Sequence, residues 1–227
     1  IGRLSYVLSQ GRQQADVLVV HPASSTWTEY RPDPPEAGRR VSDLAAVGTG
    51  VASLASALCE HQIAWDFGDE RILRDHASLA PNGAIQVGRM RYRVVVVPPL
   101  VTIEASTRDL LAAFADRGGT VLAPGRLPDH VSGRPQSVGL PAESVANHDA
   151  LIARLEALDV ERLRVDEIRG PRASLFSQRR LTGEEEILFL ANVDAEDPIE
   201  LTVAPDPLPA SAPWERWDAL DGTIRVE

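Results

Sequence analysis

Three apolar runs, at residues 16–22, 92–97 and 120–125, constrain the fold of this 227-residue chain more than any other feature. They read DVLVVHP, YRVVVV and TVLAPG, and most consecutive positions in them are apolar. A strand with this pattern has to be covered on both faces, as in the parallel sheets of α/β proteins. Helical patterns alternate with the runs across short connections, which predicts an α/β fold with a mostly parallel, doubly wound sheet.

The helical patterns carry their own start and stop signals. Residues 41–62 repeat apolar side chains at helical spacing, and Ser42 is suited to the N-cap. Asp69 is suited to cap a short helix that runs to His76, and Gly118 to end a helix that Ser106 or Thr107 caps. The other expected elements are a strand at 63–67, a turn at 88–89, a helix at 148–158, a polar loop at 24–40 and a loop-rich stretch after Gly125.

The periodicity changes after about residue 164. Alternating apolar and polar residues there predict antiparallel strands, with turns at Thr182-Gly183, at 196–198 and at Asp221-Gly222. About 60 residues are too few for a complete β-sandwich, which takes about 100. The sequence therefore predicts an α/β domain over 1–160 and, over 161–227, an antiparallel β segment that is part of an incomplete sandwich.

Composition excludes several classes of function. Hydrophobic residues make up 44% of the chain, which is enough for a packed core, and the net charge is −10. An acidic protein is a poor ligand for nucleic acid or for an anionic membrane, and no apolar run is long enough to span a bilayer. All 23 basic residues are arginine, which indicates a bacterium with a GC-rich genome. Both a cytoplasmic and a secreted location stay open.

Familiar catalytic and cofactor motifs are missing from the sequence. It contains neither G-x-G-x-x-G nor G-x-x-x-x-G-K-[ST], and its five histidines form no metal motif, so we expect no cofactor and no metal. Its only cysteine, Cys59, lies in a helical pattern, and no cysteine or G-x-S-x-G follows a strand as a nucleophile would. Ser24 and Ser25 follow the first strand near His21, but serines in a polar loop usually form turns.

Six residues remain as a candidate binding site, because ligands of α/β sheets bind beyond the carboxyl ends of the strands. Acidic residues after the second strand could perform acid–base chemistry or bind sugar hydroxyls; alternatively, one caps the next helix and another favours its first turn. The aromatic residues could stack on a sugar ring or anchor their loop to the domain. The six residues are His21, Trp27, Tyr30, Asp66, Asp69 and Glu70.

Several long stretches resemble one domain of large bacterial enzymes. They read YVLSQGRQQADVLVVHPASSTW, HQIAWDFGDERIL and GRMRYRVVVVPPLVTIEASTRDLLAAFADRGGTVLAPGRLP. They are similar to the domain that follows the catalytic barrel in multidomain glycoside hydrolases, α-L-rhamnosidase-like or β-galactosidase-like. That domain is flavodoxin-like and resembles a degenerate class I glutamine amidotransferase, and some β-galactosidases use it for trimerisation. The stretches EEEILFLANVDAEDPIELTV and WDALDGTIRVE are similar to the β-sandwich that comes next.

The resemblance implies a role without catalysis. Such enzymes hold their catalytic carboxylates in the barrel, which would precede Ile1, with LSQG at the junction. The chain would then be a piece of a longer enzyme that packs against the barrel of the same polypeptide. It would contribute loops to the sugar site or support assembly into a homo-oligomer. Two alternatives stay open, a free-standing amidotransferase-like hydrolase and a carbohydrate-binding or oligomerisation module.

Overall fold

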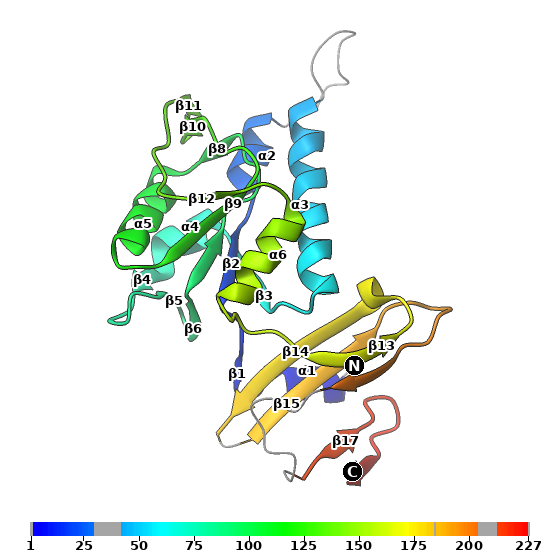
Figure 1. Ribbon diagram of the computed structural model, residues 1–227. Coiled ribbons are helices and arrows are strands. Elements are labelled where there is room, and N and C mark those ends of the chain that lie inside the picture. Colours follow the sequence, from blue (N-terminus) through cyan, green and yellow to red (C-terminus); the bar gives the residue numbers. More distant parts are fainter. Residues whose placement is uncertain (1, 30–41, 184, 204–212, 227) are drawn as a thin grey trace. The chain divides into compact units, whose positions relative to one another are not determined.

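The chain folds into two compact units. The computed structural model describes residues 2–29, 42–183, 185–203 and 213–226. One unit is formed by Ala15–Glu161 and the other by Ile1–Gln14 together with Arg162–Glu227 (Figure 1). We refer to them as the α/β unit and the β unit. The division into domains at 1–160 and 161–227 stays a prediction, and the described residues before Ala15 group with the β unit.

A five-stranded parallel sheet forms the centre of the α/β unit, as the apolar runs predict. Its strand order is β12-β9-β7-β2-β3, and every neighbouring pair is parallel. The strands are β2 (Val17–Val20), β3 (Trp65–Gly68), β7 (Val94–Val96), β9 (Thr120–Pro124) and β12 (Glu143–Val145). The middle strands are buried at almost every position, which explains their unbroken apolar sequence.

Two hydrophobic cores lie on opposite faces of this sheet. Val17 and Val19 belong to one core, and the alternate residues Leu18 and Val20 belong to the other. The first core includes side chains of α3 (Ser42–Glu60) and α6 (His148–Ala157); the second includes side chains of α4 (Glu70–His76) and α5 (Ala105–Asp116). Figure 1 shows these helix pairs on the two sides of the sheet. Helices therefore cover both faces.

The run at 92–97, predicted as a single strand, divides in two. Tyr92 ends β6 (Met90–Tyr92), which belongs to an antiparallel sheet with β4 (Ala77–Leu79) and β5 (Ile85–Val87). The next strand, β7, belongs to the parallel sheet. Between them, the N–H groups of Arg93 and Val94 both donate to the Asp16 carbonyl, at 3.0 and 3.1 Å. Two donors on one acceptor interrupt the regular ladder, and the chain changes sheets there.

Other local predictions also need correction. The segment after β2 is not a loop throughout, because Ala23–Glu29 form the helix α2. The loop-rich stretch contains β12 and the short strands β10 (His130–Val131) and β11 (Arg134–Pro135), which form a sheet with β8 (Thr102–Ile103). The N-cap of α5 is Glu104, not Ser106 or Thr107. Gly118 does follow the helix with a φ of +85°, as predicted.

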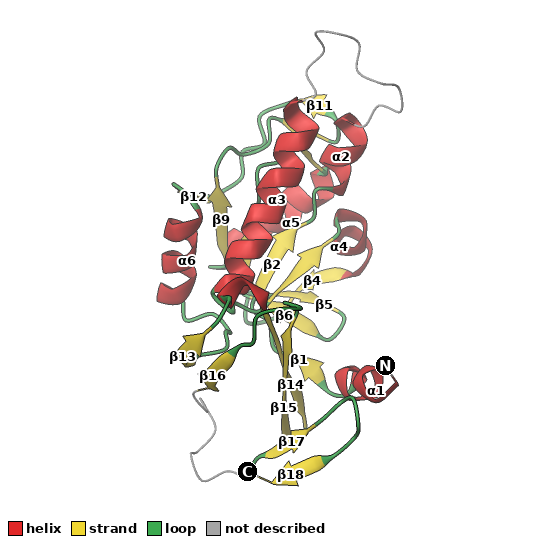
Figure 2. Ribbon diagram, turned by 90° about the vertical axis from the view of Figure 1, so that its right-hand side faces the viewer, coloured by secondary structure: helices red, strands yellow, loops and turns green. Residues whose placement is uncertain are grey.

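The β unit is antiparallel, as the alternating pattern predicts. Its largest sheet has the order β1-β14-β15, and two further pairs join β13 with β16 and β17 with β18 (Figure 2). Among its described residues, Leu175 is the one buried apolar side chain, at 2% exposed. Its elements are α1 (Gly2–Ser9), β1 (Arg12–Gln13), β13 (Val165–Arg169), a 3₁₀ turn (Arg172–Ser174), β14 (Leu175–Thr182), β15 (Glu185–Asn192), β16 (Glu200–Val203), β17 (Glu215–Trp217) and β18 (Ile224–Val226).

Gly11 allows the chain to pass from α1 into β1. Its φ is +60°, and a Cβ atom at this position would lie 2.0 Å from the Leu181 carbonyl oxygen. Gly183, in the turn between β14 and β15, has a similar φ of +65°, but a Cβ atom there would meet open space within 4 Å. Both glycines therefore have a left-handed backbone conformation, but only Gly11 lies in close contact with another part of the backbone.

We expect Gly11→Ala to destabilise the β unit by about 3 kcal/mol or more, because it adds a clash with backbone to left-handed strain. Gly183→Ala, the matched control, should cost about 1–2 kcal/mol from the strain alone. Hydrogen exchange of the β14 amides measures both effects. Equal losses in the two variants would contradict the close approach at Gly11.

Candidate functional site

The carboxyl ends of the parallel strands meet at one edge of the sheet, which we call the rim. It comprises the segments after β2 (His21–Ser25), after β3 (Asp69 and Glu70) and after β7 (Val97–Glu104). The chain passes from β2 to β3 on one side and later to β7 on the other. Ligands of such sheets usually bind at this reversal, between the first strand and the strand on its other side. The β2–β7 boundary is therefore the place to look for a site.

Ser25 joins the two rim segments at the β2–β7 boundary. Its hydroxyl group donates to the Thr102 carbonyl at 3.0 Å. It accepts from the N–H groups of Val101 and Thr102, at 3.0 and 3.1 Å. The Ser25 side chain is 1% exposed. The position at which a ligand would meet free backbone N–H groups is thus occupied by a side chain of the protein itself.

Pro99 covers the next part of the rim. A Cβ atom at Gly125, after β9, would lie 3.2 Å from the Pro99 Cγ atom, and one at Gly50 of α3 would lie 3.7 Å from it. The φ of Gly125 is +111°, which favours glycine. Pro99 therefore lies close both to α3 and to the segment after β9.

Asp66 and Asp69, two of the three predicted carboxylates, each bind groups close to them in the fold. Asp69 is the N-cap of α4, as one of the two interpretations predicts, and it accepts from the N–H groups of Arg71 and Ile72 at 2.9 and 3.2 Å. Asp66 accepts a hydrogen bond from the Tyr92 hydroxyl at 3.0 Å. Burial raises the pKa of Tyr92, and the charge of Asp66 raises it further. Both carboxylates thus stabilise local structure.

Glu70 is the third carboxylate and the most buried, at 2% exposed. Its Oε2 atom accepts from the N–H group of Glu104 at 2.7 Å, which links the β3–α4 corner to the start of α5. Burial raises the pKa of Glu70, while the bond from Glu104 N–H and the nearby Ser24 and Thr107 hydroxyls oppose this effect. A buried carboxyl group with a raised pKa resembles a general acid, but its contacts are those of an internal brace.

The predicted aromatic and histidine positions differ in accessibility. Trp27 lies on α2 and is 81% exposed, so it does not anchor its segment to the domain. His21 packs edge-on against Phe67, with 5.0 Å between ring centroids, and its Nδ1 atom is buried without a hydrogen bond. Phe67 in turn packs edge-on against Trp65 at 4.7 Å. Tyr30 lies outside the described residues.

Sequence reasoning missed the residues that organise the rim. Ser25 appeared only as a turn former, and Ser132 and Glu104 were not singled out. Ser132 has an unusual φ of +47°, and its hydroxyl donates to the Glu104 Oε2 atom at 2.9 Å. No local pattern marks these residues, because their partners are 27 to 77 positions away.

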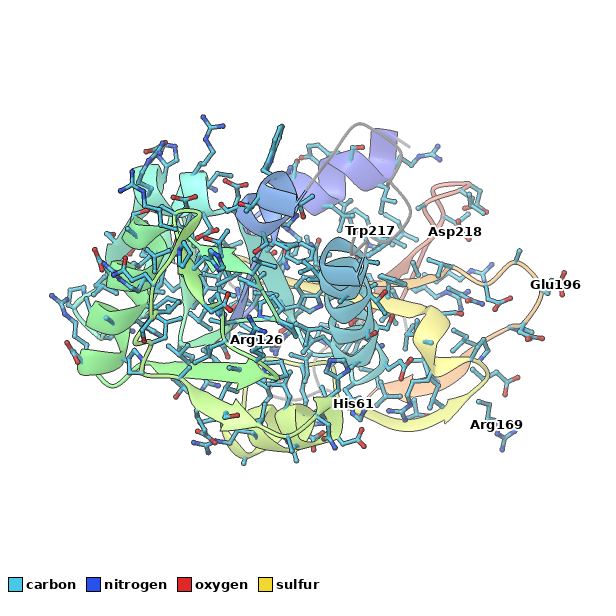
Figure 3. The ribbon with its side chains drawn as sticks, turned by 90° about the horizontal axis from the view of Figure 1, so that it is seen from above. His61, Arg126, Arg169, Glu196, Trp217 and Asp218 are labelled. Atoms are coloured by element: carbon cyan, nitrogen blue, oxygen red, sulfur yellow. The ribbon has the colours of Figure 1, made fainter. Side chains whose placement is uncertain are left out.

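Other chemical groups in the α/β unit form no catalytic set among the residues that the structure describes. Cys59 lies near the end of α3, not after a strand, and burial raises the pKa of its thiol. Arg126, labelled in Figure 3, donates to the exposed carboxylate of Asp129, which also lies 2.7 Å from the His130 Nδ1 atom. The described residues contain no group of three or more metal-binding side chains. None of the described helices is long and apolar enough to cross a membrane.

Comparison with known proteins identifies the fold. No protein-family model and no curated protein matches the chain. The apo exo-carrageenase GH42 from Bacteroides ovatus matches 99% of the chain at 12% identity with a TM-score of 0.58. Gan42B, a GH42 β-galactosidase, matches 93% at 12% identity with a TM-score of 0.56. A rhamnosidase from Novosphingobium sp. PP1Y matches 84% at 18% identity with a TM-score of 0.50.

These matches cover only part of each enzyme. This chain spans 29% of the carrageenase, 38% of the β-galactosidase and 18% of the rhamnosidase. The fold is therefore a mixed α/β arrangement that resembles a portion of several glycoside hydrolase chains.

We expect Ser25→Ala to destabilise the α/β unit by about 2–4 kcal/mol, because two backbone N–H groups lose their acceptor in a buried place. Ser53→Ala is a suitable control: its exposed hydroxyl donates to the Thr49 carbonyl at 2.7 Å within α3, and its loss should change stability by less than about 0.5 kcal/mol. Chemical denaturation of both variants measures the difference. A Ser25→Ala variant as stable as the wild-type protein would contradict the role of Ser25 in joining the segments at the β2–β7 boundary.

Proposed function

We propose that this chain is a non-catalytic accessory part of a bacterial glycoside hydrolase. In this proposal it packs against the catalytic barrel of the same polypeptide. The fold likeness supports it, because 84–99% of the chain matches a fraction of each of three glycoside hydrolases. The sequence resemblance to the domain after the barrel points independently to the same class of enzyme.

We also propose that the α/β unit is a flavodoxin-like, doubly wound domain. Numbered along the chain, the parallel strands run in the order 2-1-3-4-5 across the sheet, which is the flavodoxin-like order. Helices on both faces of the sheet agree with this assignment. The resemblance to amidotransferases extends to no catalytic residue, since the single cysteine lies within a helix.

One observation carries the non-catalytic role: the polar groups at the rim are engaged with the protein itself. Ser25 binds the backbone at the β2–β7 boundary, Asp69 caps α4, and Glu70 holds the start of α5. Glycoside hydrolysis needs two carboxyl groups that face a common substrate. Here each carboxylate faces a backbone or hydroxyl donor of the fold.

We therefore expect the purified chain to show no turnover of nitrophenyl galactosides, rhamnosides or related glycosides. Absorbance of released nitrophenol measures this, with a whole glycoside hydrolase as the positive control. Turnover by the purified chain that disappears in Glu70→Gln would overturn the proposal, because the rim would then supply a catalytic group. Turnover that persists in that variant would indicate a catalytic site elsewhere in the chain and would also overturn it.

A second candidate function is a carbohydrate-binding or oligomerisation module, and the exposure of Trp27 favours it. A tryptophan residue that is 81% exposed is suited to stacking on a sugar or on a second protein surface. Under this candidate, Trp27→Ala should abolish binding of galactose or rhamnose in titration, or lower the mass measured by light scattering.

Trp217→Ala is the matched control for that experiment, because Trp217 of the β unit is 57% exposed (Figure 3). It should leave both readouts unchanged. A monomer that binds neither sugar would rule out this second candidate and leave the accessory role.

A further inference from the structure

Helix α5 begins without a cap of its own. Its N-cap residue is Glu104, whose side chain makes no capping hydrogen bond to the helix. The first backbone N–H groups of a helix have no acceptor within the helix and need one from elsewhere. Thr107, three residues after the N-cap, is 1% exposed, and its Oγ1 atom has no hydrogen bond.

Two distant side chains supply the missing acceptors. The Glu70 Oε2 atom accepts from the N–H group of Glu104 at 2.7 Å. The Ser132 Oγ atom accepts from the N–H group of Ala105 at 3.2 Å and donates to the Glu104 carboxylate at 2.9 Å. We call Glu70, Glu104 and Ser132 the α5 latch. It joins the segment after β3, the start of α5 and the turn after β10.

The latch contains strain and a buried acidic group. Ser132 holds a φ of +47°, a left-handed conformation that is strained for a residue with a side chain. Glu70 is 2% exposed, and its Oε1 atom is buried without a hydrogen bond. The charged group of another element that acts on it is Glu104, whose carboxylate carries the same sign, while Ser24 and Thr107 offer hydroxyls.

We propose that the α5 latch is a proton-sensitive brace, in which protonation of Glu70 holds the start of α5 against the rim and loss of that proton loosens it. The geometry supports this role because one buried carboxyl group joins two corners of the rim through one oxygen atom, while its other oxygen atom is buried without a hydrogen bond. The proposal concerns the α/β unit alone and does not depend on the proposed accessory role.

The direction of the pH dependence follows from linkage. Burial raises the pKa of Glu70 above its ordinary value of 4.5 when the latch is closed. When it opens, the carboxyl group meets water and its pKa returns toward that value. The closed state therefore holds the proton more tightly, and its advantage is complete below the ordinary pKa and declines as the pH rises toward the raised pKa.

Hydrogen exchange of the Glu104 and Ala105 amides, corrected at each pH for the intrinsic rate, tests the proposal. Between the two pKa values of Glu70, we expect the opening equilibrium to rise up to ~tenfold for each pH unit and then to level off. Glu70→Gln should keep the acceptor for Glu104 N–H and show no such rise.

Three further variants separate the contributions. Glu104→Gln removes the like charge and should make the total rise smaller. Ser132→Ala should weaken protection of Ala105 at every pH without changing the rise. Asp75→Asn, an exposed carboxylate on α4 bound to Arg74, should leave the rise unchanged.

Two results would overturn the proposal: an equal rise in Glu70→Gln and in the wild-type protein, or no rise in the wild-type protein. If Glu70→Gln fails to fold, carbon-13 NMR of the Glu70 carboxyl group in the wild-type protein decides. A pKa above its ordinary value of 4.5 supports the brace, and one at or below that value overturns it.

Discussion

A parallel sheet has to hide both of its faces from water, and this requirement organises the α/β unit. The alternate side chains of β2 enter two different cores, so helices have to return to both faces of the sheet. Each return brings a loop and a helix end to the same edge. The rim is therefore crowded with backbone N–H groups that the sheet itself cannot satisfy, and polar side chains have to collect there.

Those polar side chains serve the backbone. In an enzyme with this kind of sheet, the backbone groups and side chains of the rim face a ligand. Here Ser25 binds backbone groups of Val101 and Thr102, and Glu70 binds the N–H group of Glu104. The same residue types that suggest a binding site in the sequence thus act as braces in the structure, and the proposed supporting role rests on this observation.

The β unit differs from the α/β unit in how it is stabilised. Its strands pair in antiparallel fashion, and β14 and β15 do so over eight residues in regular register. Among its described residues, however, Leu175 is the one buried apolar side chain. A unit that buries so little apolar surface gains little from the hydrophobic effect, so strand pairing and ion pairs carry more of its stability. One of these pairs joins Arg179 of β14 with Glu186 of β15, and both side chains are largely covered.

Local patterns predicted the elements whose cause is local. The apolar runs predicted β2 and β9, the cap at Asp69 predicted α4, and turn chemistry predicted the hairpin at Gly183. Local sequence patterns did not predict elements whose formation depends on a contact with a distant part of the chain. The strand β12 has only one buried residue in three and joins the sheet because β9 offers it an open edge.

For the candidate site, too, local sequence predicted some features and distant contacts decided others. By itself, the sequence determined that His21, Asp69 and Glu70 follow the ends of strands, because strand length and chain order are encoded by local periodicity. The prediction that Asp66 also follows a strand was wrong, because Asp66 is the second residue of β3. The tertiary structure alone decided that Glu70 is buried against the start of α5 while Trp27 faces water. Burial depends on which segments fold over a residue, and those segments lie tens of residues away in the chain.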